Sequence, residues 1–309
     1  MSDKKIISLL PAATEIVCAL GLEHLLVGRS HECDYPETVK TLPVCSSAKF
    51  IPGSDSAAID KQVKDILAGA LSIYELDKDM IRELNPEVII TQAQCEVCAV
   101  SLTDVKDALD NLLEADAEVI SLEPHGLEDV LTDIETVAIR LNVPEKGKEV
   151  LEALRARTHL IKHKLKFQDQ KPTIACIEWL SPLMIAGNWT PEMVDIAGGI
   201  PILAERGKHS AFIDPALLRE TDPEILLIIP CGFSIERTLS EISILFDLPG
   251  WHDLAAVKNN RIYIADGNQY FNRSGPRIID SIEILAEIIH PKQFVFGYEG
   301  QGWVRFELI

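Results

Sequence analysis

The sequence predicts an α/β protein with two lobes, each built on a parallel sheet, and with one long helix joining the lobes. Three observations predict this fold. A ten-residue unit occurs twice, at 81–90 and at 218–227, and each copy runs from the end of a helix through a Pro-Glu turn into an unbroken apolar run. Such a run is typical of a parallel strand buried on both faces. Strands and helices also alternate in both halves, and an uninterrupted helical pattern at 144–167 separates the halves.

The first lobe begins with a predicted strand at 6–10 and a helix that Pro11 opens and Gly21 ends. Proline suits the first turn of a helix, and glycine suits the position just after its last turn. Apolar runs and apolar residues at helical spacing define the other elements. The predicted strands are 25–28, 88–91 and 119–122, and the predicted helices are 59–71, 80–84, 105–113 and 127–141. Residues 46–77, which begin with a polar and turn-rich segment, look like an addition to this lobe.

The connecting helix follows from one apolar stripe. Val150, Leu154, Ile161 and Leu165 recur at four- and seven-residue spacing behind Pro144. Basic residues crowd the second half, where they complement the negative end of the helix dipole. At 1.5 Å per residue the pattern spans roughly 36 Å, which is long enough to run along two lobes.

The second lobe restarts the alternation after this helix. Its predicted strands are 173–178, 225–229 and 262–265, and its predicted helices are 193–197 and 278–289. Two aromatic runs separated by glycines follow Pro291 and predict a small hairpin or a packed extension. We therefore expect an N-terminal Rossmann-like lobe at 1–143, a connecting helix at 144–170, a C-terminal Rossmann-like lobe at 171–290 and an aromatic extension at 291–309.

The composition limits the classes of binding partner that we expect. The chain has a net charge of −19, which argues against nucleic acid and against anionic membrane surfaces, because both require basic residues. We find no apolar stretch long enough to cross a membrane and no signal-peptide pattern. The seven cysteines are easiest to keep in a reducing compartment. The sequence as written therefore predicts a cytoplasmic protein with a small-molecule ligand, or an extracytoplasmic one if a leader has been removed.

The expected binding site follows from the sheets. In open α/β sheets, ligands bind outside the carboxyl ends of the strands, so two sheets predict a ligand cleft between the lobes. The segments after the predicted strands are rich in aromatic, amide and thiol side chains, and they contain no Gly-rich phosphate loop. Core packing is an equal alternative for any single aromatic residue. The position of four together favours a flat apolar ligand surface made by Trp179, Trp189, Tyr270 and Phe271.

The thiols leave three interpretations open. Cys95-x-x-Cys98 is a metal half-site, a redox pair or packing. A closed zinc site needs a second pair of ligands, and His31, Cys33 and Cys231 could supply it because all three follow predicted strands. In a different class of function, Cys95, Cys98 or Cys231 would be the reactive group of a thiol-dependent enzyme, and such a thiol needs a depressed pKa.

Several segments together resemble the cobalamin-binding proteins of ABC importers. They are the doubled unit, Pro11-Ala12-Ala13-Thr14-Glu15, Asp34-Tyr35-Pro36 and the stretch Tyr270-Phe271-Asn272-Arg273-Ser274-Gly275-Pro276-Arg277. The resemblance covers about residues 5–290. The wider family, in which a helical backbone joins two lobes, includes receptors for siderophores, haem and metal ions.

This resemblance implies a rigid, non-catalytic receptor that holds a corrinoid between its lobes and docks on an ABC permease through surface carboxylates. In such a receptor, His31 or a cysteine of the cleft could ligate cobalt directly. The ligand-facing candidates that the resemblance carries over, with the neighbouring aromatic Tyr270, are Tyr35, Gln94, Trp179, Trp189, Phe271 and Arg273. The cysteine-rich segments differ from those of the exported receptors. A transition metal, haem or siderophore held by cysteine and histidine is therefore the second hypothesis.

Overall fold

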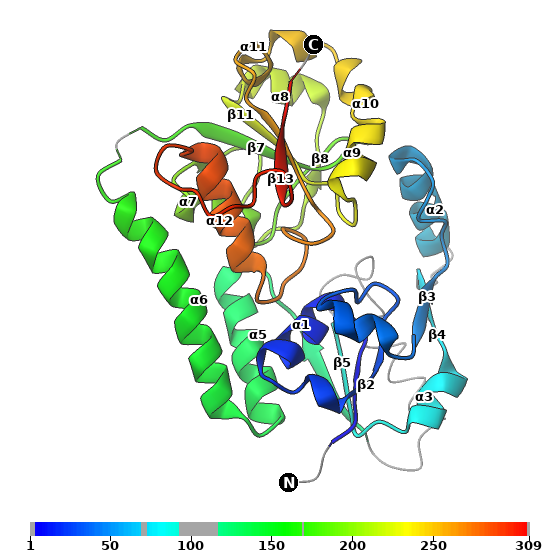
Figure 1. The fold of residues 1–309 in the computed structure, drawn as a ribbon. Coiled ribbons are helices and arrows are strands. Elements are labelled where there is room, and N and C mark those ends of the chain that lie inside the picture. Colours follow the sequence, from blue (N-terminus) through cyan, green and yellow to red (C-terminus); the bar gives the residue numbers. More distant parts are fainter. Residues whose placement is uncertain (1–3, 69–72, 93–116, 169, 308–309) are drawn as a thin grey trace. The chain divides into compact units, whose positions relative to one another are not determined.

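The computed structural model describes residues 4–68, 73–92, 117–168 and 170–307 and divides the chain into two compact units (Figure 1). Unit 1 comprises the described residues of 1–54, 58–124 and 128–152. Unit 2 comprises residues 55–57 and 125–127 and the described residues of 153–309. In the described residues, no helix combines the length and the apolar character needed to cross a bilayer.

Unit 1 is built on a four-stranded parallel sheet in the order β2-β1-β5-β6. The strands are β1 (Ile6–Ser8), β2 (Leu26–Arg29), β5 (Val88–Gln92) and β6 (Glu118–Leu122). Every residue of β1 and β5 is buried, as their apolar sequences predict. The helices are α1 (Pro11–Ala19), α2 (Ser56–Ala68), α3 (Lys78–Leu84) and α5 (Leu127–Arg140), with 3-10 turns at Glu23–Leu25 and Glu37–Thr41. The helix expected at 105–113 lies outside the described residues.

The segment that we expected as an addition carries a small sheet of its own. Strands β3 (Ser46–Ala48) and β4 (Tyr74–Leu76) pair antiparallel and enclose α2 in the sequence. Sequence patterns did not indicate these strands, because each has only three residues and its partner lies far along the chain.

Unit 2 contains a larger mixed sheet in the order β10-β8-β7-β11-β12-β13, with β9 paired to β7. Its parallel centre consists of β7 (Thr173–Trp179), β11 (Ile225–Ile228) and β12 (Ile262–Ala265). The short outer strands are β8 (Met184–Ile185), β9 (Ile200–Pro201) and β10 (Ala211–Phe212). The helices are α7 (Thr190–Ile196), α8 (Pro215–Thr221), α9 (Ile235–Glu241), α10 (Ser243–Phe246), α11 (Ala255–Lys258) and α12 (Ile278–Ile289), with a 3-10 turn at Trp251–Asp253.

The doubled sequence folds the same way in both units. Helices α3 and α8 end at Asn85 and Asp222, which adopt left-handed backbones with φ/ψ of 45°/66° and 43°/65°. Asn and Asp enter this region more readily than most residues, so they suit the end of a helix. The amide of each donates to a carbonyl one turn back, that of Ile81 or Leu218.

The Pro-Glu pair of the doubled sequence then anchors the neighbouring strand. Glu87 Oε2 accepts the amide N–H of Lys5 at 3.2 Å, immediately before β1. Glu224 Oε2 accepts the amide N–H of Thr173 at 3.0 Å, at the start of β7. The same carboxylate therefore satisfies a backbone donor at the amino end of the adjacent strand in each unit.

Helix α6 (Pro144–Lys164) begins in unit 1 and ends in unit 2, as one uninterrupted helix of 21 residues. It is three residues shorter than the pattern suggested. The chain tightens beyond it, where the amide of Gln168 donates to the carbonyl of Leu165 at 3.0 Å. In unit 2 the helix lies alongside α12 (Figure 1), and Arg157 donates to Asp280 and Glu283.

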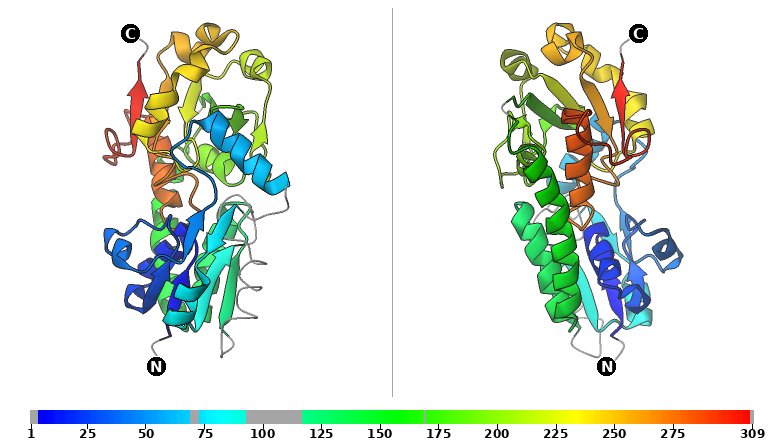
Figure 2. Two further views of the ribbon diagram at one scale, coloured as in Figure 1. Left: turned by 90° about the vertical axis from the view of Figure 1, so that its right-hand side faces the viewer. Right: turned by 60° about the vertical axis from the view of Figure 1, so that its left-hand side comes forward.

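The aromatic tail belongs to the sheet of unit 2. Strand β13 (Trp303–Phe306) pairs antiparallel with β12 and forms the edge of the sheet (Figure 2). Glu287 of α12 is buried and accepts hydrogen bonds from the amides of Phe296 and Gly297 and from Trp303 Nε1. The tail is thus fastened at its middle by one carboxylate.

Candidate functional site

The carboxyl ends of β7, β11 and β12 meet at one edge of the unit 2 sheet, because the three strands are parallel neighbours. The segments that follow them are Trp179–Pro182, Pro230–Phe233 and Asp266–Arg277. The amides of Gly267 and Asn268 both donate to the carbonyl of Phe233, at 2.9 and 3.1 Å. These bonds hold the segments after β11 and β12 together, so this edge is preorganised by backbone contacts.

Trp179 ends β7, and its indole has a fixed orientation. The indole Nε1–H donates to the carbonyls of Ser56 at 3.2 Å and of Ser181 at 3.1 Å. The ring centroid lies 5.2 Å from that of Phe233, and the guanidinium of Arg237 lies 4.9 Å from the centre of the Phe233 ring. Trp179 is partly exposed while Phe233 is buried. Trp179 therefore presents an aromatic surface on a rigid support.

A buried carboxylate ties residues 55–57 into the same cluster. Glu241 Oε2 accepts the amide N–H of Ser56 at 2.8 Å. The other oxygen, Oε1, lies 2.5 Å from Arg237 Nη2. The sequence offers no signal for this contact, because Ser56 and Glu241 are 185 residues apart.

Two of the four predicted aromatic residues pack inside unit 2. Phe271 has no exposed surface and Trp189 is 7% exposed. Trp189 Nε1 donates to the carbonyl of Phe271 at 2.6 Å, and the amide of Phe271 donates to Ser281 Oγ at 2.9 Å. Their ligand-facing role stays a prediction, and in this structure the two rings brace the loop after β12.

The loop after β12 is organised by polar side chains. Asp266 Oδ1 accepts the amides of Asn268 and Gln269, at 2.9 and 2.7 Å. The buried Arg273 donates to Asn268 Oδ1 at 3.2 Å, and the buried Arg277 donates to Gln269 Oε1 at 2.7 Å. Two arginines thus hold the amide side chains of this loop in place.

Tyr270 belongs to the same loop and is partly exposed. The guanidinium of Arg277 lies 5.6 Å from its ring centre, which is within the range of a cation–π contact. The ring of Tyr298 from the tail meets it edge-on at 5.9 Å. Tyr270 is therefore fixed on two sides.

In unit 1, the segment after β2 is held by the small sheet. His31 Nδ1 lies 2.9 Å from Ser46 Oγ, and its ring lies 5.3 Å from that of Tyr74. Tyr74 donates to Glu32 Oε1 at 3.0 Å. Burial, and secondarily the charge of Arg29, lowers the pKa of His31. The imidazole thus favours its neutral form, which is the form that binds metals, but Nδ1 is already engaged.

The remaining candidates in unit 1 differ in exposure. Tyr35 is 45% exposed and Cys33 is fully buried. Gln94, Cys95 and Cys98 lie outside the described residues. Cys231, in unit 2, is exposed. Among described residues, no three His, Cys, Asp or Glu side chains are placed to bind one metal ion. The metal set of His31, Cys33, Cys95, Cys98 and Cys231 stays a prediction.

Three other thiols are poor nucleophiles. Burial raises the pKa of Cys45 to about 11 and the pKa values of Cys18 and Cys176 to about 12. A reactive thiol requires the opposite shift. These cysteines behave as small apolar residues of α1, the β2–β3 segment and β7.

Glu178, at the end of β7, predicts a pH dependence. Burial raises its pKa from 4.5 to about 7, although Ser210 Oγ donates to it. The folded protein thus binds this proton more tightly than the unfolded chain, so stability falls as pH rises from about 4.5 to about 7. We therefore expect the difference in free energy of unfolding between Glu178→Gln and the wild type to shift in favour of the variant by about 1–3 kcal/mol from about pH 5 to about pH 8. Urea unfolding at both pH values measures this, and an equal difference at the two would contradict it.

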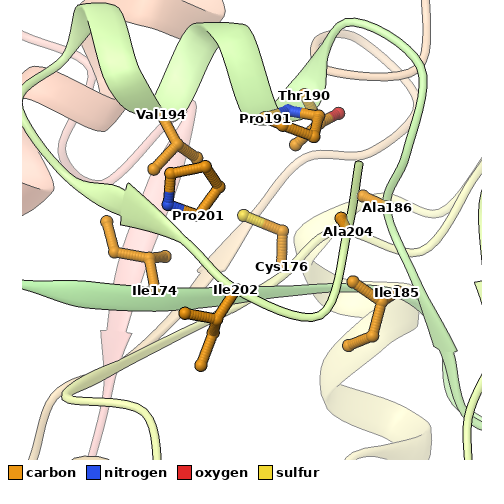
Figure 3. A pocket seen from close by; sticks show the side chains of 10 residues that line it. All are labelled: Ile174, Cys176, Ile185, Ala186, Thr190, Pro191, Val194, Pro201, Ile202 and Ala204. Atoms are coloured by element: carbon orange, nitrogen blue, oxygen red, sulfur yellow. The ribbon is translucent and has the colours of Figure 1, made fainter. Parts of the chain in front are cut away.

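A hollow in unit 2 is apolar and small. It is lined by residues of β7, β8, α7 and the segment after β9, and the Cys176 sulfur points into it (Figure 3). Its cavity volume of about 10 Å³ is far below the roughly 300–1,000 Å³ of small-molecule sites. The edge after β7, β11 and β12 is the better candidate in this unit.

Comparison with known proteins identifies the family. Residues 6–268 match the sequence profile described as "Periplasmic binding protein". The chain belongs to the periplasmic binding protein family. Because these proteins bind solutes and are not enzymes, the chain is a non-catalytic substrate-binding protein of the ABC-transporter type. The thiol-dependent enzyme that the sequence left open is therefore wrong.

Two relatives and one solved structure show what the chain is similar to. The uncharacterized ABC transporter substrate-binding lipoprotein YvrC of Bacillus subtilis is 23% identical, over 94% of this chain and 81% of its own. The vitamin B12-binding protein of Vibrio campbellii is 22% identical, over 92% of this chain and 88% of its own. The crystal structure of a possible iron-binding protein from Staphylococcus epidermidis superposes with a TM-score of 0.70 at 20% identity, covering 93% of this chain and 98% of that one. The fold is that of class III periplasmic binding proteins.

Proposed function

We propose that this protein is a receptor that binds a corrinoid and delivers it to an ABC importer. The observation that carries the proposal is the segment 270–277, which follows β12 and whose sequence resembles that of the cobalamin-binding branch. The match to a vitamin B12-binding protein along 92% of the chain supports it. A corrin is large and flat, and it suits aromatic side chains that are held rigidly at a sheet edge.

The predicted site residues differ in their exposure to solvent. We propose Trp179, Tyr270 and Tyr35 as ligand contacts, because their side chains are at least partly exposed after strands. Trp189, Phe271 and Arg273 are proposed to support the loop that carries Tyr270, because they are buried within unit 2. Gln94 stays a predicted contact outside the described residues.

Substitution of Trp179 tests the site. We expect Trp179→Ala to weaken hydroxocobalamin binding about tenfold or more, because it removes a preoriented aromatic surface, and Trp179→Phe to weaken it less. Isothermal titration calorimetry measures both. Phe212→Ala is the matched control, since Phe212 is an exposed aromatic residue on β10 of the same unit.

Thermal unfolding of each variant separates loss of binding from loss of fold. Unchanged affinity in a folded Trp179→Ala protein would remove Trp179 from the site. An equal loss in Phe212→Ala would show that the effect is not specific to the sheet edge.

A transition metal, haem or siderophore is the second candidate. The possible iron-binding protein that shares the fold supports this alternative. Among its predicted ligands, His31 has one ring nitrogen engaged, Cys33 is buried and Cys231 is exposed. Cys95 and Cys98 stay predicted ligands outside the described residues. Saturable binding of haemin with no binding of hydroxocobalamin would favour it.

We also propose that the protein works outside the cytoplasmic membrane with an ABC permease as its partner. The names of the relatives, a substrate-binding lipoprotein among them, support the extracytoplasmic expectation over the cytoplasmic one. Docking on the permease is proposed to use surface carboxylates of both units.

A further inference from the structure

The lysines near the two ends of α6 differ in their ion-pair partners. In the first half, Lys146 Nζ lies 2.7 Å from Glu149 and Lys148 Nζ lies 2.8 Å from Glu145. At the end of the helix and just beyond it, Lys162, Lys164 and Lys166 are exposed, and no carboxylate among the described residues lies within ion-pair distance of them. Residues 162–168 contain no acidic residue in a chain of net charge −19.

The start of the tail extends this surface within unit 2. Gln293 Nε2 donates to Gln168 Oε1 at 3.4 Å, and Lys164 Nζ lies 5.3 Å from the ring centre of Phe294. The exposed Lys292 adds a further charge, and residues 288–298 are also free of acidic residues. We call this surface the basic patch; its members are Lys162, Lys164, Lys166, Phe167, Lys292 and Val295.

Two apolar side chains stand out from the basic patch. Phe167 is 85% exposed and Val295 is 86% exposed, the two highest values among the large apolar residues that the structure describes. Lys166 Nζ lies 5.6 Å from the centre of the Phe167 ring, so charge and apolar surface are adjacent. Leu160, in the last part of α6, is 48% exposed and adds a third exposed apolar side chain to this region.

We propose that the basic patch binds the surface of an anionic phospholipid bilayer. Ammonium groups would meet the headgroups, and Phe167 and Val295 would enter the boundary between headgroups and acyl chains. Side chains that project singly suit a fluid boundary, whereas a protein partner would need a hollow for each. The net charge of −19 does not prevent this binding, because charges beyond about 8 Å are screened at physiological ionic strength.

Vesicle co-sedimentation tests the proposal on the full chain. We expect binding to phosphatidylcholine vesicles containing about one third phosphatidylglycerol, and none to pure phosphatidylcholine. Replacing Lys162, Lys164 and Lys166 by Gln should weaken binding about a hundredfold, since each lysine contributes to attraction by the anionic surface. Phe167→Ser with Val295→Ser should weaken it at least tenfold through lost apolar insertion. Every substituted position is exposed, so these variants should fold.

One control lies in the first half of α6, and the other lies on a different strand of unit 2. Lys146→Gln with Lys148→Gln removes charge from the first half of α6, and Phe212→Ser removes an exposed ring from β10; both should bind as the wild type does. Absence of wild-type binding at low salt, or an equal loss in the controls, would overturn the proposal. Equal binding to soluble poly-L-glutamate, insensitive to Phe167→Ser, would overturn it by assigning the patch to an acidic polypeptide.

Discussion

Gly267→Ala is expected to destabilise the protein by about 2–3 kcal/mol and to disrupt the candidate site. A Cβ at position 267 would lie 2.1 Å from the carbonyl oxygen of Pro230 and 2.9 Å from the carbonyl carbon of Ile229. Both neighbours are backbone at the end of β11, so no side-chain rotation can relieve the overlap. The loop after β12 would have to move away from the segment after β11.

The same loop carries the bonds that such a shift would break. The amide of Gly267 donates to Phe233, and Asn272 Nδ2 donates to the carbonyls of Gly267 and Ile229, each at 3.0 Å. We therefore expect solute affinity to fall together with stability. Urea unfolding and calorimetric titration of the variant measure the two effects.

Gly53→Ala is the control for this substitution. A methyl group at position 53 would meet no atom within 4 Å, and the residue has no positive φ. Its replacement should therefore change stability by less than about 1 kcal/mol. A Gly267→Ala protein as stable as the Gly53→Ala protein would contradict the tight packing of the two loops.

Glu287→Ala is expected to release the tail at a cost of about 3 kcal/mol. The carboxylate is 4% exposed and accepts three hydrogen bonds, at 2.7 Å from the amide of Gly297, at 2.8 Å from Trp303 Nε1 and from the amide of Phe296. Its removal leaves three donors without their acceptor, and the indole N–H of Trp303 among them is buried. Strand β13 should then open locally from β12.

Hydrogen–deuterium exchange of β13 measures this opening, and tryptophan emission should shift to the red as Trp303 becomes exposed. Glu220→Ala, on the exposed face of α8, is the control and should alter neither signal. Unchanged exchange in Glu287→Ala would mean that strand pairing alone holds the tail.

The elements that could be predicted have a strong local signal. Helix α12 spans residues 278–289 as its apolar pattern indicates, and β11 and β12 follow from unbroken apolar runs. The strands that could not be predicted are short or antiparallel additions. Strands β8, β9 and β10 have two residues each, too few to establish any period.

The candidate site was predictable in place but not in detail. Parallel strands specify which segments share an edge, so the positions of Trp179 and the loop at 270–277 followed from the sequence. The burial of each side chain did not follow from the sequence. An aromatic residue after a strand has the same local pattern whether it packs inward, as Phe271 does, or stays partly exposed, as Tyr270 does. The contact of Ser56 with Glu241 depends on tertiary structure alone.

The central claim is that the protein binds a corrinoid without transforming it. Calorimetric titration of the wild type with hydroxocobalamin, beside a parallel titration with haemin, tests it most directly. We predict saturable one-to-one binding of hydroxocobalamin at micromolar affinity or tighter, with the corrinoid recovered unchanged and with weaker binding of haemin. No binding of hydroxocobalamin beside saturable binding of haemin would contradict the corrinoid assignment.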